Sequence, residues 1–361
     1  MKIDIDINDI EDFKGLLGKI KNNHELDSSN HTLKIYCLNS ELTRQELFSY
    51  LSRVHGKETQ FINDFSMTHL NPETPDEIIF YCYKDSQNNI VFIFSITGKS
   101  KIDMAIERLM RFLPKTYYFW IPLHLFEKLK EEIIDKYDKE NVFINYFSSL
   151  RSDYHKIDCT FRPHISRKII YEGDDGLEVL RELKTIYGIL PRKIGFSIGT
   201  KLQFSIDHRN TFIIEYGFPY LNYIWEIIDL SLQKYAGVHD VLADVRFEKI
   251  KSDGIFDFNV HPLRIKFSQP KVYEDVTTFF ELLENDELGE GRYCVLNPLI
   301  KEGSLFFSAM ILDSNKNSIL TVSGDENEMT VLPHSNCGKD VLSRFYEQID
   351  LNFDTNTKVI R

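Results

Sequence analysis

Three short stretches of the sequence place residue types at spacings that could do chemistry, and the first is Gly98-Lys99-Ser100. The apolar run 91–94 leads through Thr97 into these residues and then into a helical pattern, so backbone amides at the helix start could bind an anion. A nucleotide-binding P-loop also requires a glycine five residues before the Gly-Lys-Ser, and this sequence has Ile93 there. We therefore expect an ordinary helix start with Ser100 as N-cap, and keep residues 98–100 as a candidate anion site.

The second stretch is a basic cluster that begins around residue 162. Its candidate nucleic-acid-binding residues are Arg162, His164, Arg167, Lys168, Arg192 and Lys193. If the strands that contain Arg162 and Lys193 pair in one sheet, these side chains could share a positive face suited to a phosphate backbone. The alternative is a solvated face that Asp153, Asp158 and Glu172 neutralise.

Within this cluster, Arg162-Pro163-His164-Ile165-Ser166 resembles one half of the two-histidine phosphoesterase motif. In that family each half supplies a histidine as general acid or base and a hydroxyl that contacts the phosphate. None of the other ten histidines is followed at the second position by Ser or Thr, so the facing half is missing. A hydrolase or phosphoesterase would have to assemble its site from distant residues.

The third stretch spans a predicted hairpin, with Pro75-Asp76 before it and Ser95-Ile96-Thr97 on its second strand. The order of helices and strands over residues 43–122 resembles the core of the restriction-endonuclease-like nucleases. That family places two carboxylates and a lysine on such a hairpin to hold a metal ion and position a water molecule. Ser95 and Thr97 stand where the acid and the lysine would be, so the resemblance implies an inactive core with Asp76, Ser95 and Thr97 as its degenerate site.

The composition favours a folded protein without a local metal or cofactor site. The chain has 361 residues, 42% of them hydrophobic, and a net charge of −12, which disfavours indiscriminate binding to nucleic acid or anionic membrane. Its 5 cysteines are scattered, which is typical of reduced thiols. No Cys-x-x-Cys pair and no closely spaced histidine pair occurs, so we expect neither a bound metal nor a cofactor.

The apolar runs are of strand length, well short of the roughly 20 residues that a membrane span needs. The N-terminal residues alternate Ile3, Ile5 and Ile7 with aspartates and do not resemble a secretory signal. We therefore expect a soluble, cytoplasmic protein.

Periodicity predicts alternating helices and strands along the whole chain. Thr43 and Glu46 form a capping box at a helix start, and Asn88-Asn89 joins strands 77–83 and 90–97 in a hairpin. The other predicted helices are 10–20, 100–113, 123–137, 176–187, 219–235, 272–284 and 339–349. The other predicted strands are 1–7, 33–38, 116–121, 142–147, 161–171, 192–198, 201–207, 211–216, 243–250, 261–268, 292–300, 304–312, 317–322 and 328–332.

This order predicts an α+β fold of two or three domains, in which mixed or antiparallel sheets pack against helices. Polar and charged stretches suggest a boundary near residue 150, and a second sheet-plus-helix pattern begins near residue 240. The expected domains are 1–150, an α/β domain with the nuclease-like core, 151–240, a β-α-β-β-β-α domain, and 241–361, a second α+β domain.

The predicted helix 219–235 is apolar or aromatic on nearly every side, and it contains Trp225. Such a helix is typical of a buried position, so we expect Trp225 to be deeply buried, either between domains or at an interface with a partner.

The leading functional hypothesis is a non-catalytic accessory or interaction subunit, attached to nucleic-acid processing or anti-phage defence. It follows from a nuclease-like region whose catalytic positions are occupied by Ser95 and Thr97. The alternatives are a metal-dependent hydrolase with a dispersed site and an oligomeric scaffold. The expected partner is another protein or a second copy, with nucleic acid as a further candidate through the basic cluster.

The purified protein should show no metal-dependent nuclease activity, because Ser95 and Thr97 cannot replace a carboxylate ligand and an ammonium. Plasmid incubated with Mg²⁺ or Mn²⁺ should stay intact in a gel assay. Cleavage that disappears in Asp76→Ala would contradict this prediction.

Overall fold

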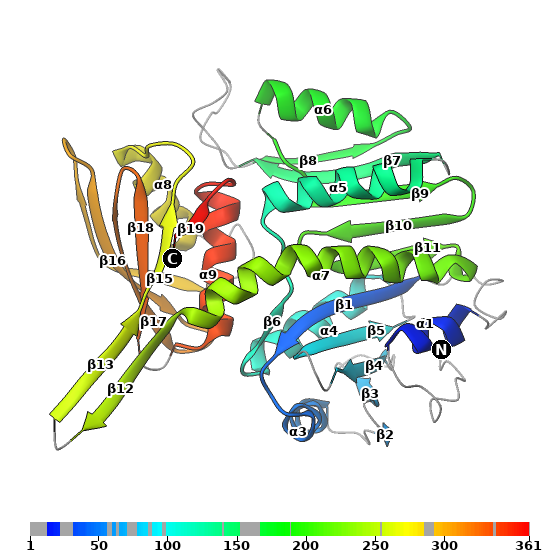
Figure 1. The fold of residues 1–361 in the computed structure, drawn as a ribbon, viewed down its shortest axis with the longest axis horizontal. Helices are drawn as coiled ribbons and strands as arrows, with labels where there is room; N and C mark the ends of the chain where they lie inside the picture. Colours follow the sequence, from blue (N-terminus) through cyan, green and yellow to red (C-terminus); the bar gives the residue numbers. More distant parts are fainter. Residues whose placement is uncertain are drawn as a thin grey trace. The chain divides into compact units, whose positions relative to one another are not determined.

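The computed structural model describes residues 13–21, 32–55, 60–62, 65–70, 78–85, 89–95, 99–138, 141–151, 167–187, 189–252, 255–284, 292–334 and 337–360. The chain divides into two compact units, unit 1 formed mainly by residues up to Lys234 and unit 2 mainly by Tyr235–Arg361 (Figure 1). Each unit combines helices with antiparallel strands, which confirms the expected α+β class.

Unit 1 is built on one antiparallel sheet in the order β2-β3-β4-β5-β1-β11-β10-β9-β7-β8, with β6 paired to β1. Its strands are β1 (Leu33–Ser40), β2 (Gln60–Ile62), β3 (Phe65–Leu70), β4 (Ile78–Lys84), β5 (Ile90–Ser95), β6 (Thr116–Tyr118), β7 (Val142–Arg151), β8 (Arg167–Glu172), β9 (Lys193–Ile198), β10 (Leu202–Asp207) and β11 (Thr211–Tyr216). The predicted boundary near residue 150 does not separate two sheets, because β7 pairs with both β8 and β9.

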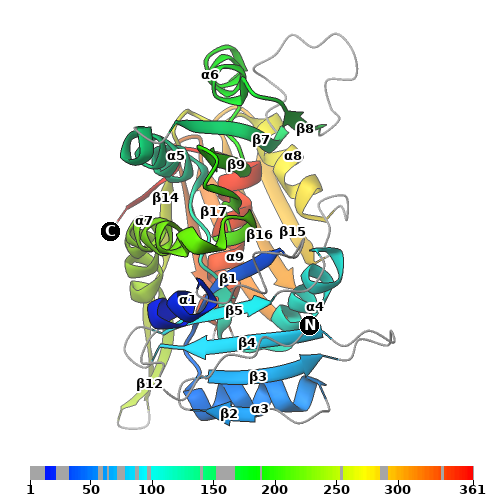
Figure 2. The same cartoon turned by 90° about the vertical axis from the view of Figure 1, so that its right-hand side faces the viewer.

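Helices lie on both faces of this sheet. They are α1 (Phe13–Lys21), α3 (Arg44–His55), α4 (Lys99–Phe112), α5 (Leu123–Tyr137), α6 (Gly176–Tyr187) and α7 (Leu221–Asp244), the last preceded by the short 3-10 helix η2 (Phe218–Tyr220). Figure 2 shows α1, α5 and α7 on one side of the sheet and α4 on the other. No helix of the described residues is long and apolar enough to cross a membrane.

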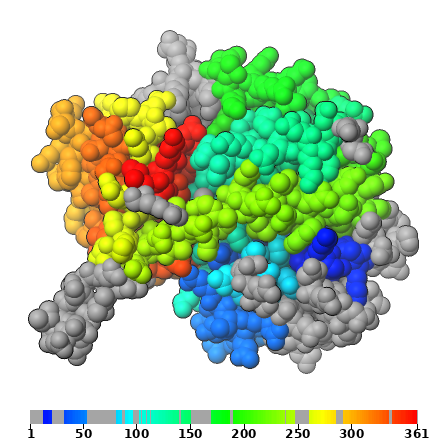
Figure 3. Space-filling model, viewed as in Figure 1, coloured from blue at the N-terminus to red at the C-terminus, as the bar shows by residue number. Residues whose placement is uncertain are grey.

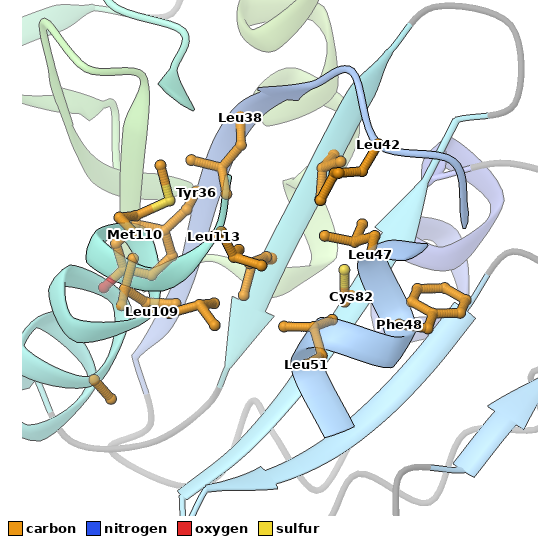
Figure 4. Packing of buried hydrophobic residues seen from close by; sticks show 14 of the residues in the cluster. Tyr36, Leu38, Leu42, Leu47, Phe48, Leu51, Cys82, Leu109, Met110 and Leu113 are labelled. Atoms are coloured by element: carbon orange, nitrogen blue, oxygen red, sulfur yellow. The ribbon is translucent and has the colours of Figure 1, made fainter. Parts of the chain in front are cut away.

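Strand β1 is the centre of the sheet and is buried along its whole length. On one face, Tyr36 and Leu38 pack with side chains of α3 and α4, such as Leu47 and Leu109 (Figure 4). On the opposite face, the neighbouring strand β5 stacks Phe92 on Phe13 of α1, with 4.1 Å between ring centroids. The sheet is therefore covered on both sides around β1.

Local sequence signals account for the entry to α3 and the link between β4 and β5. The backbone amide of Thr43 donates to Glu46 Oε2 at 2.8 Å, and the amide of Glu46 donates back to Thr43 Oγ1 at 3.3 Å, which confirms the predicted capping box. Strands β4 and β5 pair as the predicted hairpin, and Asn89 at its turn has a φ of 42°.

Unit 2 contains a six-stranded antiparallel sheet in the order β15-β16-β17-β18-β14-β19, and a separate pair, β12-β13. Its strands are β12 (Arg246–Ser252), β13 (Ile255–His261), β14 (Leu263–Lys266), β15 (Tyr293–Lys301), β16 (Phe306–Asp313), β17 (Ser318–Asp325), β18 (Glu328–Pro333) and β19 (Lys358–Ile360), and its own helices are α8 (Tyr273–Glu284) and α9 (Lys339–Asn352). Phe280 of α8 packs against Phe307 of β16, and Phe345 of α9 packs against Tyr293 of β15.

Several elements differ from the sequence prediction. Strands β2, β3, β13 and β19 were not predicted. Of these, β2, β3 and β19 are short or polar runs, which carry little periodic signal. Helix α7 continues to Asp244, past the predicted end at 235, because the apolar spacing resumes at the buried Leu242. The predicted strand 261–268 is shorter in the structure, where β14 begins at Leu263, directly after Pro262, which has no amide hydrogen for a sheet. The predicted strand 1–7 lies outside the described residues.

The expectation that Trp225 is deeply buried is wrong. Trp225 is only partly buried, and its ring lies 6.1 Å from that of Phe13 and 6.2 Å from that of Phe92. Helix α7 is amphipathic over this stretch, with Asn222 and Asp229 exposed, and part of its length forms molecular surface (Figure 3). The deeply buried tryptophan is Trp120, which is 1% exposed.

Trp120→Ala should lower the free energy of unfolding by about 3 to 5 kcal/mol, because it leaves a large cavity in a closed core. Trp225→Ala should cost less than half of that, since part of its ring is already in water. Urea denaturation followed by circular dichroism measures both. Equal losses for the two variants would contradict the assigned burial.

Candidate functional site

The described structure includes only some of the residues that the sequence singled out. Ser95 ends β5 and is fully buried, and Lys99 and Ser100 begin α4. The remaining members of the two predicted sites near the hairpin, Asp76, Thr97 and Gly98, lie outside the described residues, as do Arg162 and His164. The inactive-nuclease resemblance and the anion site at Gly98-Lys99-Ser100 therefore stay predictions.

The rest of the basic cluster is distributed over separate strands. Arg167 and Lys168 begin β8, Arg192 precedes β9 and Lys193 begins it. Strand β7 lies between β8 and β9 and pairs with both, so these two strands are not direct neighbours. Two strand spacings, about 10 Å, separate their backbones.

Ser95 is the cross-strand partner of a buried lysine that the sequence analysis missed. Lys34 on β1 is fully buried, and its Nζ lies 2.5 Å from Asp103 Oδ1 on α4. The Tyr36 hydroxyl donates to the same oxygen at 2.6 Å. The Asp103 side chain is 46% exposed, so this ion pair connects the interior of the sheet with its surface. The sequence does carry one signal for this ion pair, which is the presence of a lysine inside the apolar run 33–38.

The groups around Lys34 are held in unreactive states. Burial, followed by the charge of Asp103 and its hydrogen bond, raises the pKa of Tyr36 far above its ordinary value. Burial likewise raises the pKa of the neighbouring Cys37 thiol, so the thiol is protonated at neutral pH. Among the described residues, no group of three or more His, Cys, Asp or Glu side chains could hold a metal ion. Because Asp103 neutralises a fully buried Lys34, we assign the Lys34–Asp103 pair a structural role.

Unit 2 buries its own ionic pairs. Arg292 Nη2 lies 2.8 Å from Asp313 Oδ2, and both side chains are at most 5% exposed. Lys316 Nζ lies 3.2 Å from Asp340 Oδ2 at the start of α9. Each pair joins one basic and one acidic side chain close to the place where β16 ends and β17 begins. Buried pairs of this kind are typical of a structural network.

The outer face of the six-stranded sheet is the candidate functional surface. The inner face carries Phe307, Ile311 and Val331, all fully buried. The side chains that alternate with them point to the opposite face, where cross-strand pairing brings apolar residues of β15, β16, β17 and β18 together. We call this set the outer apolar face: Leu296, Leu299, Phe306, Met310, Leu312, Ile319 and Leu332.

Asp103→Asn should lower the free energy of unfolding by about 2 kcal/mol, because it leaves the Lys34 ammonium buried without its carboxylate. We expect less than the 3 to 5 kcal/mol of a fully buried pair, since Asp103 is half exposed. Urea denaturation measures the loss, and Glu107→Gln on the exposed side of the same helix is the control.

The double variant Lys34→Met with Asp103→Asn separates charge burial from general damage. Removing both charges should restore most of the lost stability. A double variant as unstable as Asp103→Asn alone would show that the buried charge is not the cause.

Comparison with known proteins links the middle of unit 1 to a family. The family model AF_0896_M, described as a family middle domain, matches residues 124–209. An uncharacterized protein of Archaeoglobus fulgidus is similar to the chain at 24% identity over 283 residues, which cover 74% of each protein. The matched segment contains β7, β8, β9 and β10 together with α6 and nearly all of α5.

Proposed function

We propose that this chain is a non-catalytic interaction subunit, which binds another protein chain through the outer apolar face of unit 2. The observation that carries the proposal is the set of apolar residues on the outward face of β15, β16, β17 and β18, which is interrupted at Thr321, the cross-strand partner of both Met310 and Leu332. A sheet with one face on a core normally turns polar residues outward. Here Met310 pairs with Leu296 on one side, and Leu312 pairs with Ile319 on the other strand.

The exposure of these side chains favours a binding surface over an extension of the core. Leu296 is 37% exposed, Leu299 48% and Phe306 41%. Exposed apolar side chains gathered on one face and bordered by polar residues are a mark of protein interaction sites. Thr330 and Arg264 on the neighbouring strands provide such a border.

The chemistry of the face supports a protein partner over a nucleic acid. Phosphate backbones are bound chiefly by clustered Lys and Arg. The residues of the outer apolar face are uncharged, and the basic side chain beside them, Lys301, lies over the Phe306 ring at 6.0 Å from its centroid. The net charge of −12 adds a long-range repulsion of polyanions. The resemblance of residues 43–122 to an inactive nuclease core is our reason to look for this partner first among nucleic-acid-processing and defence proteins.

Met310→Lys with Leu332→Lys should abolish partner binding, because two ammonium groups would be desolvated in the middle of an apolar contact. The first readout is affinity capture from the source cells, with quantitative mass spectrometry of wild type and variant. A captured protein is then purified and its Kd measured, and we expect a loss of roughly tenfold or more. If the partner is a second copy of this chain, size-exclusion chromatography with light scattering detects the dimer by its mass.

Glu274→Gln with Glu281→Gln is the matched control. It shifts the net charge by the same amount at exposed positions of α8, which packs against the inner face of the sheet. This control should keep the partner, and both variants should keep the wild-type melting temperature within a few degrees. If wild type neither self-associates nor binds a purified partner, or if the control loses binding equally, the proposed function fails.

A further inference from the structure

A second surface lies on unit 1, on the face of the sheet opposite α5 and α7. Direct cross-strand pairs form one continuous row from β5 to β8, through Ser95, Lys34, Ile213, Ser205, Gly195, Tyr146 and Glu172. Paired residues in a sheet point to the same face, so this row crosses the strands at a right angle. Its β5 end is closed by α4 through the contact of Lys34 with Asp103.

The other end of the row is hollowed into an open depression of about 480 Å³ over β7 to β11. We call it the trough, and define it by Tyr146, Glu172, Lys193, Gln203, Ser205 and Glu215, around Gly195 at its floor. All its strands except β11 belong to the segment that matches the family middle domain. The trough is independent of the outer apolar face, which belongs to unit 2.

The trough stays open because the residue at its floor has no side chain. A Cβ on Gly195 would lie 2.8 Å from Asn145 Oδ1 and 2.9 Å from Tyr146 Cβ. A bulge between Ile144 and Tyr146 in β7 brings Asn145 to this place. A larger residue at 195 would therefore collide with β7 and fill the middle of the trough.

Ser205 supplies a buried hydroxyl that has no partner in the described structure. The residue is 6% exposed, and its Oγ makes no hydrogen bond to the protein. Leaving a buried hydroxyl unpaired costs about 1 to 3 kcal/mol, so such groups usually meet a ligand or water. Because Ser205 lines the trough, a bound ligand can satisfy it.

The charges of the trough favour a cationic ligand. Glu172 is exposed at the β8 end, and Glu215 is exposed at the β11 end, where its Oε2 accepts from Gln203 Nε2 at 2.9 Å. Lys193 is the basic member, and its Nζ lies over the Tyr146 ring at 5.8 Å from the centroid. Two carboxylates against one ammonium give the trough a negative balance, which repels a phosphate backbone.

We propose that the trough binds an extended basic segment of a partner polypeptide, with an arginine or lysine at Glu172 and another at Glu215. Four strand spacings of about 4.8 Å separate β8 from β11, which gives about 19 Å. An extended chain advances about 3.3 Å per residue, so the two basic residues stand five or six positions apart. Between them, the Ser205 hydroxyl bonds a backbone group of the segment.

Fluorescence polarisation with the full chain tests the proposal at about 50 mM salt, where ionic contacts are weakly screened. The probe is a fluorescein-labelled peptide with two arginines separated by five Gly and Ser residues. Comparison probes have two adjacent arginines, two glutamates at the same spacing, or a single-stranded oligonucleotide. The spaced arginine peptide should bind tightest, and Glu172→Gln with Glu215→Gln should weaken it by roughly fivefold or more.

Glu178→Gln with Glu182→Gln is the matched control, since it removes the same charge from exposed positions on α6. The control should bind as wild type. Ser205→Val should weaken binding without lowering the melting temperature, because it removes an unpaired hydroxyl. Equal loss in the control, tighter binding of the oligonucleotide, or no preference for the spaced arginines would overturn the proposal, and none of these results depends on the outer apolar face.

Discussion

Unit 1 depends on the pairing of β1 with β5 along one edge and with β11 along the other. Without β1, the sheet would fall into one part made of β2 to β5 and another made of β7 to β11. A strand in this position is buried on both faces, which normally requires apolar residues throughout. β1 ends with the buried polar residues Asn39 and Ser40, and its one charged residue is Lys34, which the carboxylate of Asp103 on α4 makes tolerable. The placement of α4 is thus tied to the centre of the sheet.

Elements whose formation depends only on residues close together in the chain could be predicted from the sequence. The capping box of Thr43 and Glu46 and the hairpin of β4 and β5 need only a few residues, and the structure has both. The α+β class followed from the same local patterns. The exposure of Trp225 could not be predicted, because it depends on which side of α7 meets Phe13 and Phe92.

The two surfaces that we propose as binding sites could not be predicted from the sequence, for a different reason. The trough joins β8, around residue 170, to β11, around residue 215, and its row continues to Lys34. Sequence spacing cannot predict such a row, because the order of the strands in the sheet decides which residues lie side by side. The outer apolar face was hidden because a strand with apolar residues on both sides reads as a buried strand. The motif analysis singled out Ser95 as part of a degenerate nuclease site. In the structure this residue is buried and pairs with Lys34 across the strands.

Helix α7 has a consequence for any attempt to dissect the protein. The division between the two units falls at Lys234 and Tyr235, inside a hydrogen-bonded helix of 24 residues that is about 36 Å long. Domains are usually separated by proteases at exposed linkers, where the backbone can enter an active site. Here the peptide bonds at the division are protected until the helix opens. A truncation at this point would also leave new helix ends, with backbone groups that no capping residue satisfies.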